Sequence, residues 1–416
     1  MNLFALTPII ILLDIITLWG IKKTFPNFCT PRWKVICIAF FIQVLFSLLI
    51  VLIGFLLEHK ARDYRMISMF YYLIGIIATI YVPKLIFSLF LLADKIISAL
   101  SLLWRRHSDD FPRNSRGIIA RCGFWVSILF IFMIIWGMIF GRYNYKVEHV
   151  DITINDLPSA FNGYKILQIS DIHAGNSDRF VKTFQKAVKK INDLEPHLIV
   201  FTGDMVNNFS EEAIPIIPVF SQLKARDGKF AVLGNHDYGG YYEWNSQADS
   251  IADHNMLQDY IEQMGFVILN NRSVIISRYN FDRMALIGIE SYGFNEHHPK
   301  QGDLEVAMES IHNIPLKVLL SHDPSFWPEK VEGKTDIDLT LSGHSHGMQI
   351  GFRLGKHLFS PAPLLGIYNW AGLYQTGNQF LYVNRGLGAI VYPGRIGMTP
   401  EITLITLWKD KLPELQ

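Results

Sequence analysis

The sequence predicts two parts, an all-α membrane region at the start of the chain and a larger α/β domain after it. Long apolar runs fill roughly the first 140 residues, as membrane helices require. From Tyr145 onward, short β-type runs alternate with amphipathic helical segments. We therefore divide the chain into a transmembrane region at residues 1–142 and an α/β domain at residues 143–416.

The composition agrees with this division and excludes some classes of protein. Half of the 416 residues are apolar, and the formal net charge is +1. No run of Lys and Arg is interleaved with aromatic residues, so we expect no nucleic-acid partner. The three cysteines, Cys29, Cys37 and Cys122, all precede the α/β domain, which therefore has neither thiolate ligands nor a disulfide framework.

Four apolar runs are each near or above the length of about 20 residues that crosses a bilayer. They are residues 3–21, 35–57, 66–92 and 118–140. The third run contains Pro83 and Lys84, so it is either one span that continues as an interfacial helix to Trp104, or two spans. Two spans would place Asp94 and Lys95 near the bilayer centre, at a cost of about 2.5–3.5 kcal/mol each. We therefore expect about four transmembrane helices.

Basic residues in short loops predict the orientation of these helices, because such loops stay on the cytoplasmic side. The first and third loops carry most of them, namely Lys22, Lys23, Arg32 and Lys34, and Lys95, Arg105, Arg106, Arg113 and Arg116. Both loops are then cytoplasmic, and the α/β domain is expected to be extracytoplasmic.

The α/β domain begins with an expected edge strand at residues 147–154. Helices are expected at residues 180–194, 211–223, 251–264 and 304–311, and further strands at residues 266–269, 274–277 and 284–289. Apolar residues recur at helical spacing in the first of these helices, and Pro196 follows its end.

Polar residues follow the carboxyl ends of five further predicted strands. The strands are residues 164–169, 197–201, 230–233, 316–320 and 337–341, and the polar residues are Asp171, His173, Asp204, Asn235, His236, His322, His344 and His346. Any one set would pass for an ordinary turn, where Asp and Asn are favoured. Because ligands of α/β proteins gather outside the carboxyl ends of strands, five sets in this order indicate one shared cleft.

The donors in these sets are nitrogen and oxygen atoms, which suit Mn, Fe or Zn. They suffice for two divalent ions that share a carboxylate at a separation of about 3.5–4 Å. Such a pair activates water and stabilises charge, which phosphoester hydrolysis requires.

The motifs resemble those of the calcineurin-like metallophosphoesterases over roughly residues 150–408. They are Asp171-x-His173, Gly203-Asp204, Gly234-Asn235-His236-Asp237, His322 and Gly343-His344-x-His346. The stretches Ser321–Pro324 and Pro400–Leu404 are similar to the membrane-attached bacterial branch of that family.

The resemblance implies a four-layer αββα sandwich and a role for each motif residue. Asp171, His173 and His346 would bind the first metal, and Asp204 would bridge the two ions. Asn235, His322 and His344 would bind the second metal. His236 would meet the phosphate and help the leaving group depart.

One position departs from the family pattern. Many members have a second Asp that orients the His of the Asn-His pair, and Asn207 stands at that position here. An amide carries no charge to stabilise an imidazolium, so we expect His236 to be a weaker base than usual. Asp237 is expected to supply part of the missing charge.

Two features outside the motifs leave alternatives open. Arg385 and Arg395 lie in Gly-flanked loops and either hold a phosphate or are paired structurally. The apolar run at residues 358–370 is either a lip that admits a lipid chain or ordinary packing.

The sequence thus predicts a membrane-anchored, dinuclear-metal phosphoesterase of a bacterial inner or cell membrane. Its substrate would be a phosphodiester, a pyrophosphate or a phosphomonoester, lipid-linked substrates included, attacked by metal-bound hydroxide. The alternative is a catalytically weak or inactive metal-binding sensor or scaffold in the membrane.

Overall fold

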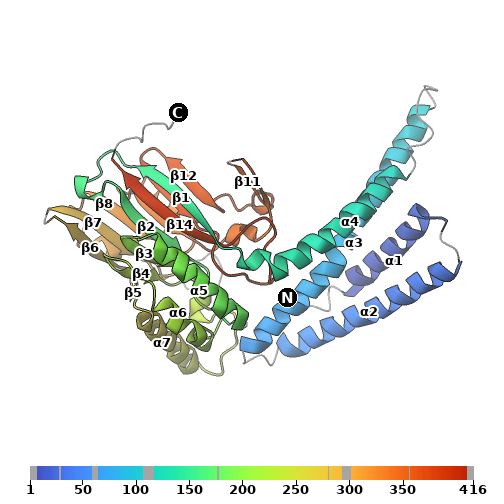
Figure 1. The fold of residues 1–416 in the computed structure, drawn as a ribbon, viewed down its shortest axis with the longest axis horizontal. Coiled ribbons are helices and arrows are strands. Elements are labelled where there is room, and N and C mark those ends of the chain that lie inside the picture. The colour runs from blue at the N-terminus through green and yellow to red at the C-terminus, as the bar shows by residue number, and fades with distance from the viewer. Residues whose placement is uncertain are drawn as a thin grey trace. The chain divides into compact units, whose positions relative to one another are not determined.

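The computed structural model describes residues 7–27, 30–58, 64–105, 117–175, 178–279, 281–292, 301–355 and 357–409. The chain divides into two compact units (Figure 1). The helical unit comprises Met1–Ile139 together with Val391–Pro393. The α/β unit comprises Phe140–Ile390 together with Gly394–Gln416.

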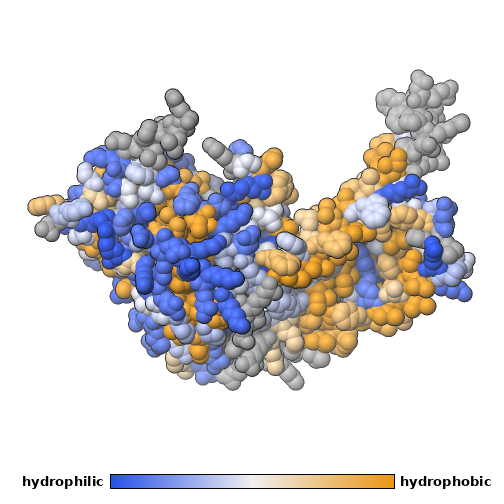
Figure 2. All heavy atoms as spheres, in the orientation of Figure 1, coloured by the Kyte–Doolittle hydropathy of each residue, from blue (hydrophilic) through white to orange (hydrophobic). Residues whose placement is uncertain are grey.

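The helical unit contains helices α1 (Thr7–Thr24), α2 (Thr30–Glu58), α3 (Tyr64–Arg105) and α4 (Ile118–Ile139). Helix α3 runs without a break through Pro83. Among the described residues, three stretches are long and apolar enough to cross a membrane, namely Thr30–Gly54, Met66–Ser101 and Ile118–Tyr143. Apolar side chains cover most of the face of the helical unit that Figure 2 shows, as contact with lipid requires.

A cluster of polar side chains lies inside the helical unit. The ammonium group of Lys84 contacts both the carboxylate of Asp14 and the side-chain oxygen of Gln43. The hydroxyl of Tyr81 donates a hydrogen bond to Asp14 Oδ2 at 3.0 Å, and the Gln43 amide donates to this hydroxyl at 2.9 Å. Charges among apolar helices are tolerated when they are paired in this way. The cluster therefore joins α1, α2 and α3.

The α/β unit is built on two six-stranded sheets. The first has the order β1 (Lys146–Thr153), β14 (Glu401–Trp408), β2 (Tyr164–Ile169), β3 (Leu198–Thr202), β4 (Lys229–Val232) and β5 (Val267–Ile268). The second has the order β12 (Gly372–Thr376), β13 (Gln379–Val383), β9 (Leu339–Ser342), β8 (Leu316–Leu320), β7 (Asp282–Gly288) and β6 (Arg272–Arg278). The runs β2-β3-β4-β5 and β13-β9-β8-β7 are parallel. Their carboxyl ends therefore lie at one edge of each sheet.

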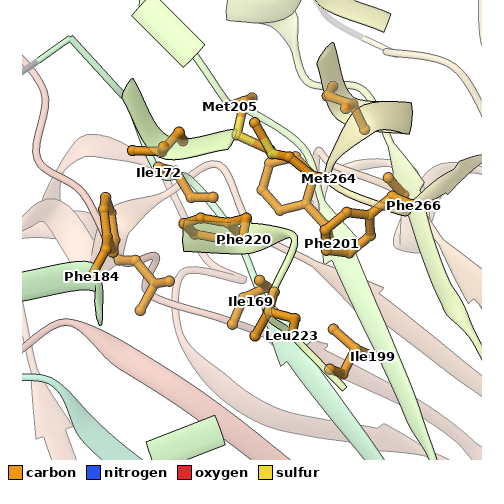
Figure 3. Packing of buried hydrophobic residues seen from close by; sticks show 14 of the residues in the cluster. Ile169, Ile172, Phe184, Ile199, Phe201, Met205, Phe220, Leu223, Met264 and Phe266 are labelled. Carbon is orange, nitrogen blue, oxygen red and sulfur yellow. The ribbon is translucent and has the colours of Figure 1, made fainter. Parts of the chain in front are cut away.

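Successive side chains on these strands point to opposite faces of the sheet and so pack into two different core layers. On β2, Leu167 and Ile169 belong to the outer core, while Ile166 belongs to the core between the sheets. The outer core packs against α5 (Asp178–Asp193), α6 (Ile217–Phe220) and α7 (Gln247–Gln263). Figure 3 shows Phe184, Phe201 and Phe220 within it.

The second sheet is covered on its other face. Leu319 on β8 packs with Ala307 of helix α8 (Leu304–Met308) and with the π-helical turn Trp327–Val331. A short hairpin of β10 (Phe352–Leu354) and β11 (His357–Phe359) stands apart from both sheets. The order is therefore helices, sheet, sheet, helices, and the predicted four-layer sandwich is confirmed.

One expected helix has a different form. Residues 211–223 were expected to be a single helix, but they form a 3₁₀ segment (Ser210–Ile216) followed by the single turn of α6. Pro215 and Pro218 explain the difference, because proline has no N–H and cannot continue the ladder of an α-helix.

The polar cluster of the helical unit gives a test of its packing. Replacing Lys84 with Met leaves the Asp14 carboxylate buried without its cation, which costs about 3–5 kcal/mol of stability. We expect a lower unfolding temperature for Lys84→Met, measured by circular dichroism in detergent. The double variant Asp14→Asn, Lys84→Met removes both charges and should regain much of the loss. Equal unfolding temperatures for the single and double variants would contradict this role of the ion pair.

Candidate metal centre

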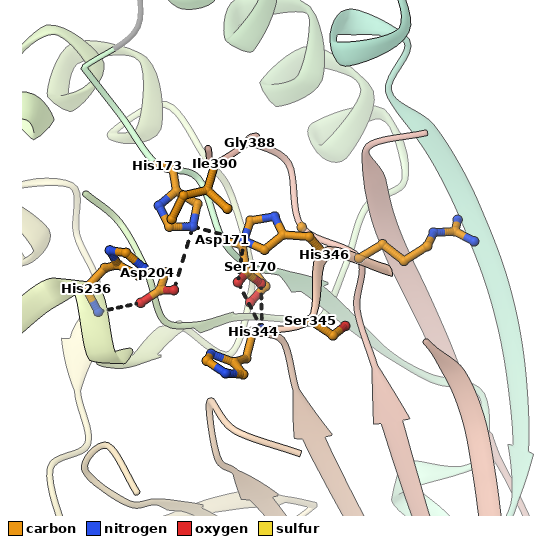
Figure 4. A network of polar contacts seen from close by, with 12 residues as sticks. Ser170, Asp171, His173, Asp204, His236, His344, Ser345, His346, Gly388 and Ile390 are labelled. Carbon is orange, nitrogen blue, oxygen red and sulfur yellow. Dashed lines mark hydrogen bonds and ion pairs between the residues drawn. The ribbon is translucent and has the colours of Figure 1, made fainter. Parts of the chain in front are cut away.

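The carboxyl ends of five strands bring the predicted ligands together (Figure 4). Asp171 and His173 follow β2, Asp204 follows β3, and Asn235 follows β4. His322 follows β8, and His344 and His346 follow β9 of the second sheet. The two sheets thus both contribute candidate ligands to the same site, one sheet from each side of the core between them.

The first group of candidate ligands consists of Asp171, His173 and His346, and all three are buried. One donor atom from each lies within 4.8 Å of the others. His173 Nε2 is 3.0 Å from His346 Nε2, and His346 Nε2 is 3.4 Å from Asp171 Oδ1. Asp171 is fixed by the backbone N–H of His344, which donates to its Oδ1 at 2.9 Å.

The second group consists of Asp204, His322 and His344. His322 Nε2 is 3.1 Å from Asp204 Oδ2 and 3.2 Å from His344 Nδ1. His322 Nδ1 donates to the carbonyl oxygen of Thr202 at 2.7 Å, so Nε2 is the nitrogen that would bind a cation once its proton has left. Asp204 Oδ2 also lies 3.7 Å from His173 Nε2, so this carboxylate stands between the two groups.

The backbone at the candidate ligands is unusual. Five of them have positive φ angles, which L-residues rarely adopt: Asp171 (49°), His173 (46°), Asp204 (61°), His344 (71°) and His346 (51°). Such residues cluster at functional sites, where the surrounding structure enforces them. Two motif glycines allow the approach. A Cβ on Gly203 would lie 2.7 Å from His322 Nδ1, and a Cβ on Gly343 would lie 2.3 Å from Asp171 Oδ2.

The electrostatics of the two groups favour a bound cation. Burial raises the pKa of Asp171 to about 7, and the nearby charge of Asp204 acts in the same direction. Burial alone would lower the pKa of His322, but its pairing with Asp204 raises it to about 10. Burial lowers the pKa of His173 to about 3, so this imidazole is neutral at pH 7, as a ligand must be.

The residues fit two divalent ions. The donors are imidazole nitrogens and carboxylate oxygens, a set that suits Mn, Fe or Zn. Within the described part of the chain, the buried Oδ1 of Asn235 has no hydrogen-bond partner, while its amide donates to Tyr241 Oη at 2.8 Å. An orphaned buried carbonyl oxygen is costly, and coordination of a cation would satisfy it.

Asp237 binds backbone N–H groups of the loops beside the candidate ligands. Its buried carboxylate accepts hydrogen bonds from the backbone N–H groups of Asp204 (2.8 Å), Met205 (2.7 Å), Val206 (3.3 Å) and Gly234 (2.9 Å). It therefore ties together the two loops that carry Asp204 and His236. The Asp237 carboxylate therefore positions these two loops.

The side-chain amide of Asn207 is held by Ala174 and Glu212. The amide donates to the carbonyl oxygen of Ala174 at 2.8 Å and to Glu212 Oε2 at 2.6 Å. The backbone carbonyl of Asn207 accepts the hydrogen bond from His236 Nδ1 at 2.7 Å instead. The missing carboxylate therefore does not leave this nitrogen without an acceptor.

Glu212, which no sequence motif selects, supports the backbone that His236 contacts. Its carboxylate is buried and accepts from the backbone N–H groups of Asn207 (2.9 Å), Asn208 (2.9 Å) and Phe209 (3.0 Å). Burial raises its pKa to about 7, while these N–H donors act in the opposite direction. The peptide between Asn207 and Asn208 thus donates to Glu212 and accepts from His236. A Glu in the first turn of a helix is common, so no pattern distinguished Glu212 from Glu211.

Arg385 and Arg395 are buried, and their guanidinium groups bind other groups of the protein. Of the two expected roles, phosphate binding and structural pairing, the structure supports structural pairing. Arg385 forms ion pairs with Glu401 (2.7 Å) and Glu148 (2.8 Å). Arg395 donates to the carbonyl oxygens of Arg385 at 2.7 Å and Gly388 at 2.8 Å. Both guanidinium groups support the loops around His346.

Comparisons with known proteins agree with this geometry. The calcineurin-like phosphoesterase family matches residues 164–348, and the family of probable calcineurin-like phosphoesterase transmembrane domains matches residues 1–142. The metallophosphoesterase YkuE of Bacillus subtilis is 32% identical over 270 residues, which cover 63% of this chain and 86% of YkuE.

Two further relatives carry more informative names. A transmembrane protein with metallophosphoesterase domain from Bos taurus is 30% identical, over 63% of this chain and 56% of its own length. The UDP-2,3-diacylglucosamine pyrophosphatase LpxG of Chlamydia muridarum is 27% identical, over 56% of this chain and 81% of LpxG.

The chain therefore belongs to the calcineurin-like metallophosphoesterases, and it is a membrane-spanning member of them. This is a family of hydrolases that use divalent metal ions to cleave phosphoesters. The resemblance inferred from the motifs is confirmed.

The protonation of His322 and Asp171 gives a test of metal binding. In the metal-free protein the pKa of His322 is about 10, so a cation must displace its proton at pH 7. The affinity for Mn²⁺ should fall about tenfold for each unit of pH below 10, and more steeply below about 7, where Asp171 also takes up a proton. Calorimetry in buffers of different ionisation enthalpy measures the released protons. Mn²⁺ binding that releases no proton at pH 8 would contradict this protonation state.

Proposed function

We propose that the α/β unit hydrolyses phosphoesters with two divalent ions that share Asp204. The observation that carries the proposal is the position of the Asp204 carboxylate between the two groups of donors, 3.1 Å from His322 and 3.7 Å from His173. In this proposal Asp171, His173 and His346 hold one ion, and Asn235, His322 and His344 hold the other. Such a pair supplies Lewis acidity and an activated water.

His236 is proposed to give a proton to the leaving oxygen. Its backbone N–H donates to Asp204 Oδ1 at 3.0 Å, so the residue stands beside the bridging carboxylate. Its Nδ1–H is engaged by Asn207, which leaves Nε2 as the nitrogen that exchanges the proton. The ring stacks on Tyr241 with centroids 4.3 Å apart, and this contact restricts its orientation.

The proposed substrate is a lipid-linked phosphodiester or pyrophosphate. Two observations support this choice: the same chain carries membrane-spanning helices, and the similar protein LpxG is named for a diacylated pyrophosphate substrate. Basic residues in the first and third loops support an extracytoplasmic α/β unit in a bacterial membrane. The name of LpxG refers to a nucleotide-linked lipid, which belongs to the cytoplasm. The part proposed for this chain is therefore the lipid-linked pyrophosphate without the nucleotide.

The sensor alternative had one supporting feature, Asn207 in place of Asp. That support weakens because the backbone of Asn207, and not its side chain, holds His236 Nδ1. In each of the two groups, three candidate ligands also lie within 4.8 Å of one another. The geometry therefore favours an active enzyme.

Hydrolysis of bis-p-nitrophenyl phosphate with added Mn²⁺ tests the proposed activity and its side of the membrane. We expect turnover by the purified full chain that falls to background in Asp204→Asn and His344→Ala, because each change removes a candidate ligand. Intact cells expressing the chain should hydrolyse this charged, impermeant substrate faster than cells expressing Asp204→Asn. Absence of turnover in the purified chain would favour the sensor, and turnover only after permeabilisation would place the α/β unit in the cytoplasm.

The contact of Glu212 with the Asn207–Asn208 peptide predicts a positioning role in proton transfer. A poor alkyl leaving group needs a proton from His236, whereas p-nitrophenolate departs without one. Glu212→Gln should lower kcat for an alkyl phosphodiester about 10- to 100-fold, with a smaller effect on the aryl ester and an unchanged KM. His236→Ala should show the same selectivity more strongly.

The exposed neighbour Glu211 provides a matched control, and Glu211→Gln should behave like the natural protein. If Glu212→Gln slows both esters equally while His236→Ala remains selective, Glu212 supports only the fold. If His236→Ala is not selective either, then the role of His236 itself is wrong.

A further inference from the structure

The α/β unit exposes an unusual number of large apolar side chains along one short segment, residues 350–368, which we call the apolar rim. They are Ile350, Phe352, Leu354, Phe359, Leu364, Leu365, Ile367 and Tyr368. Leu364 is 89% exposed, Tyr368 76% and Leu354 68%. Soluble proteins rarely expose extended apolar surface unless it contacts a partner or a membrane.

The hairpin of β10 and β11 shows that this exposure is organised. Cross-strand partners share one face of a hairpin, and Phe352 pairs with Phe359 while Leu354 pairs with His357. The rings of Phe352 and Phe359 stack with centroids 4.9 Å apart. The opposite face carries Leu358, which packs on the small core around Trp370 and Met398. One face of the hairpin is therefore packed, and the other presents aromatic and aliphatic groups outward.

The charge of the segment indicates which surface it meets. Residues 350–370 contain Arg353, Lys356 and His357 and no Asp or Glu. Arg353 forms an ion pair with Glu148 at 2.6 Å, so the basic residues left for a bilayer are Lys356 and, when it is protonated, His357. Apolar and aromatic groups next to basic residues are typical of elements that lie in the interface of an anionic bilayer. Helix α4 ends at Ile139, and the α/β unit begins at Phe140, so the chain itself keeps a bilayer within reach.

The apolar rim is tied closely to the candidate metal centre. The hydroxyl of Ser345, which lies between His344 and His346, donates to the carbonyl oxygen of Trp370. The hydroxyl of Ser360 donates to the carbonyl oxygen of Gly347 at 3.3 Å. A membrane contact at the rim would therefore hold the candidate ligands at a defined distance from the lipid headgroups.

We infer that residues 350–368 are a membrane-docking surface, which inserts its apolar side chains into the interface of an anionic bilayer. This deepens the proposed function, because docking there would present lipid-linked phosphoesters to the metal centre. The inference itself depends on the membrane attachment of the chain and not on the identity of the substrate.

Fluorescence quenching in liposomes tests the docking directly. Cys29, Cys37 and Cys122 are replaced by Ser in the full chain, and Leu364→Cys is labelled with an environment-sensitive fluorophore. Lipid-attached quenchers should quench this label severalfold more than a label at Phe281→Cys, which is 87% exposed in another loop. The difference should shrink when anionic lipids are left out. Equal quenching at the two positions would overturn the inference. Self-quenching between Leu364 labels on different copies of the chain, at a protein density where the Phe281 label shows none, would also overturn it, because it would indicate a second copy.

Turnover separates this inference from the proposed function. The variant Leu364→Ser, Leu365→Ser should lower hydrolysis of a lipid pyrophosphate in liposomes about tenfold, because interfacial binding scales with buried apolar surface. Its hydrolysis of bis-p-nitrophenyl phosphate should not change. A variant that loses the quenching difference but hydrolyses the lipid pyrophosphate as fast as the natural chain would overturn the link between docking and substrate. A chain that docks but hydrolyses neither substrate would overturn the proposed function and leave the docking surface in place.

Discussion

The candidate metal centre depends on the position of one carboxylate, that of Asp204. It is the carboxylate that lies near imidazoles from both groups of donors, with Oδ2 3.1 Å from His322 and 3.7 Å from His173. Burial opposes its ionisation, but the surrounding imidazoles, His322 foremost, hold the pKa of Asp204 well below its usual range. Two cations can share a ligand when an ionised carboxylate lies between their donor groups, as Asp204 does. The Asp204 carboxylate therefore links the two groups of donors.

The backbone around Asp204 explains how such an arrangement is maintained. Left-handed φ angles at five candidate ligands cost on the order of 1–3 kcal/mol each, so they persist only where the surroundings determine them. Asp237 binds the N–H of Asp204 from one side, and the carbonyl oxygen of Asp204 accepts from the N–H of Ile172 at 2.8 Å on the other. The buried strands β2 and β3 hold these loops in register. The stability of the core is thus used to keep the donor atoms in place.

The sequence was sufficient for the layers of the sandwich and for the order of the donor groups. The resemblance to the calcineurin-like metallophosphoesterases implied the layers. The strand ends predicted that the donor groups meet, because parallel strands must bring their carboxyl ends to one edge. The side-chain contacts of Asn207, Asp237 and Glu212 could not be predicted in the same way. A carboxylate beside a catalytic histidine and a carboxylate that binds backbone N–H groups look alike in a sequence. The choice between them depends on loop geometry, which here involves positive φ angles and a 3₁₀ segment shaped by Pro215 and Pro218.

The contact between Glu212 and the Asn207 peptide gives a physical reason for Asn at this position. Three buried carboxylates meet at residues 204–209. One belongs to Asp204 itself, and those of Asp237 and Glu212 accept hydrogen bonds from the backbone N–H groups of this stretch. The amide nitrogen of Asn207 lies 2.6 Å from Glu212 Oε2. An Asp at position 207 would place a carboxylate oxygen where this nitrogen lies, and like charges at that distance repel strongly. With Asn207, the amide becomes a donor to Glu212. The peptide that follows it then links Glu212 to His236 through hydrogen bonds of 2.9 and 2.7 Å, and consecutive hydrogen bonds of this kind polarise one another. His236 can therefore be oriented by a carboxylate that it does not touch.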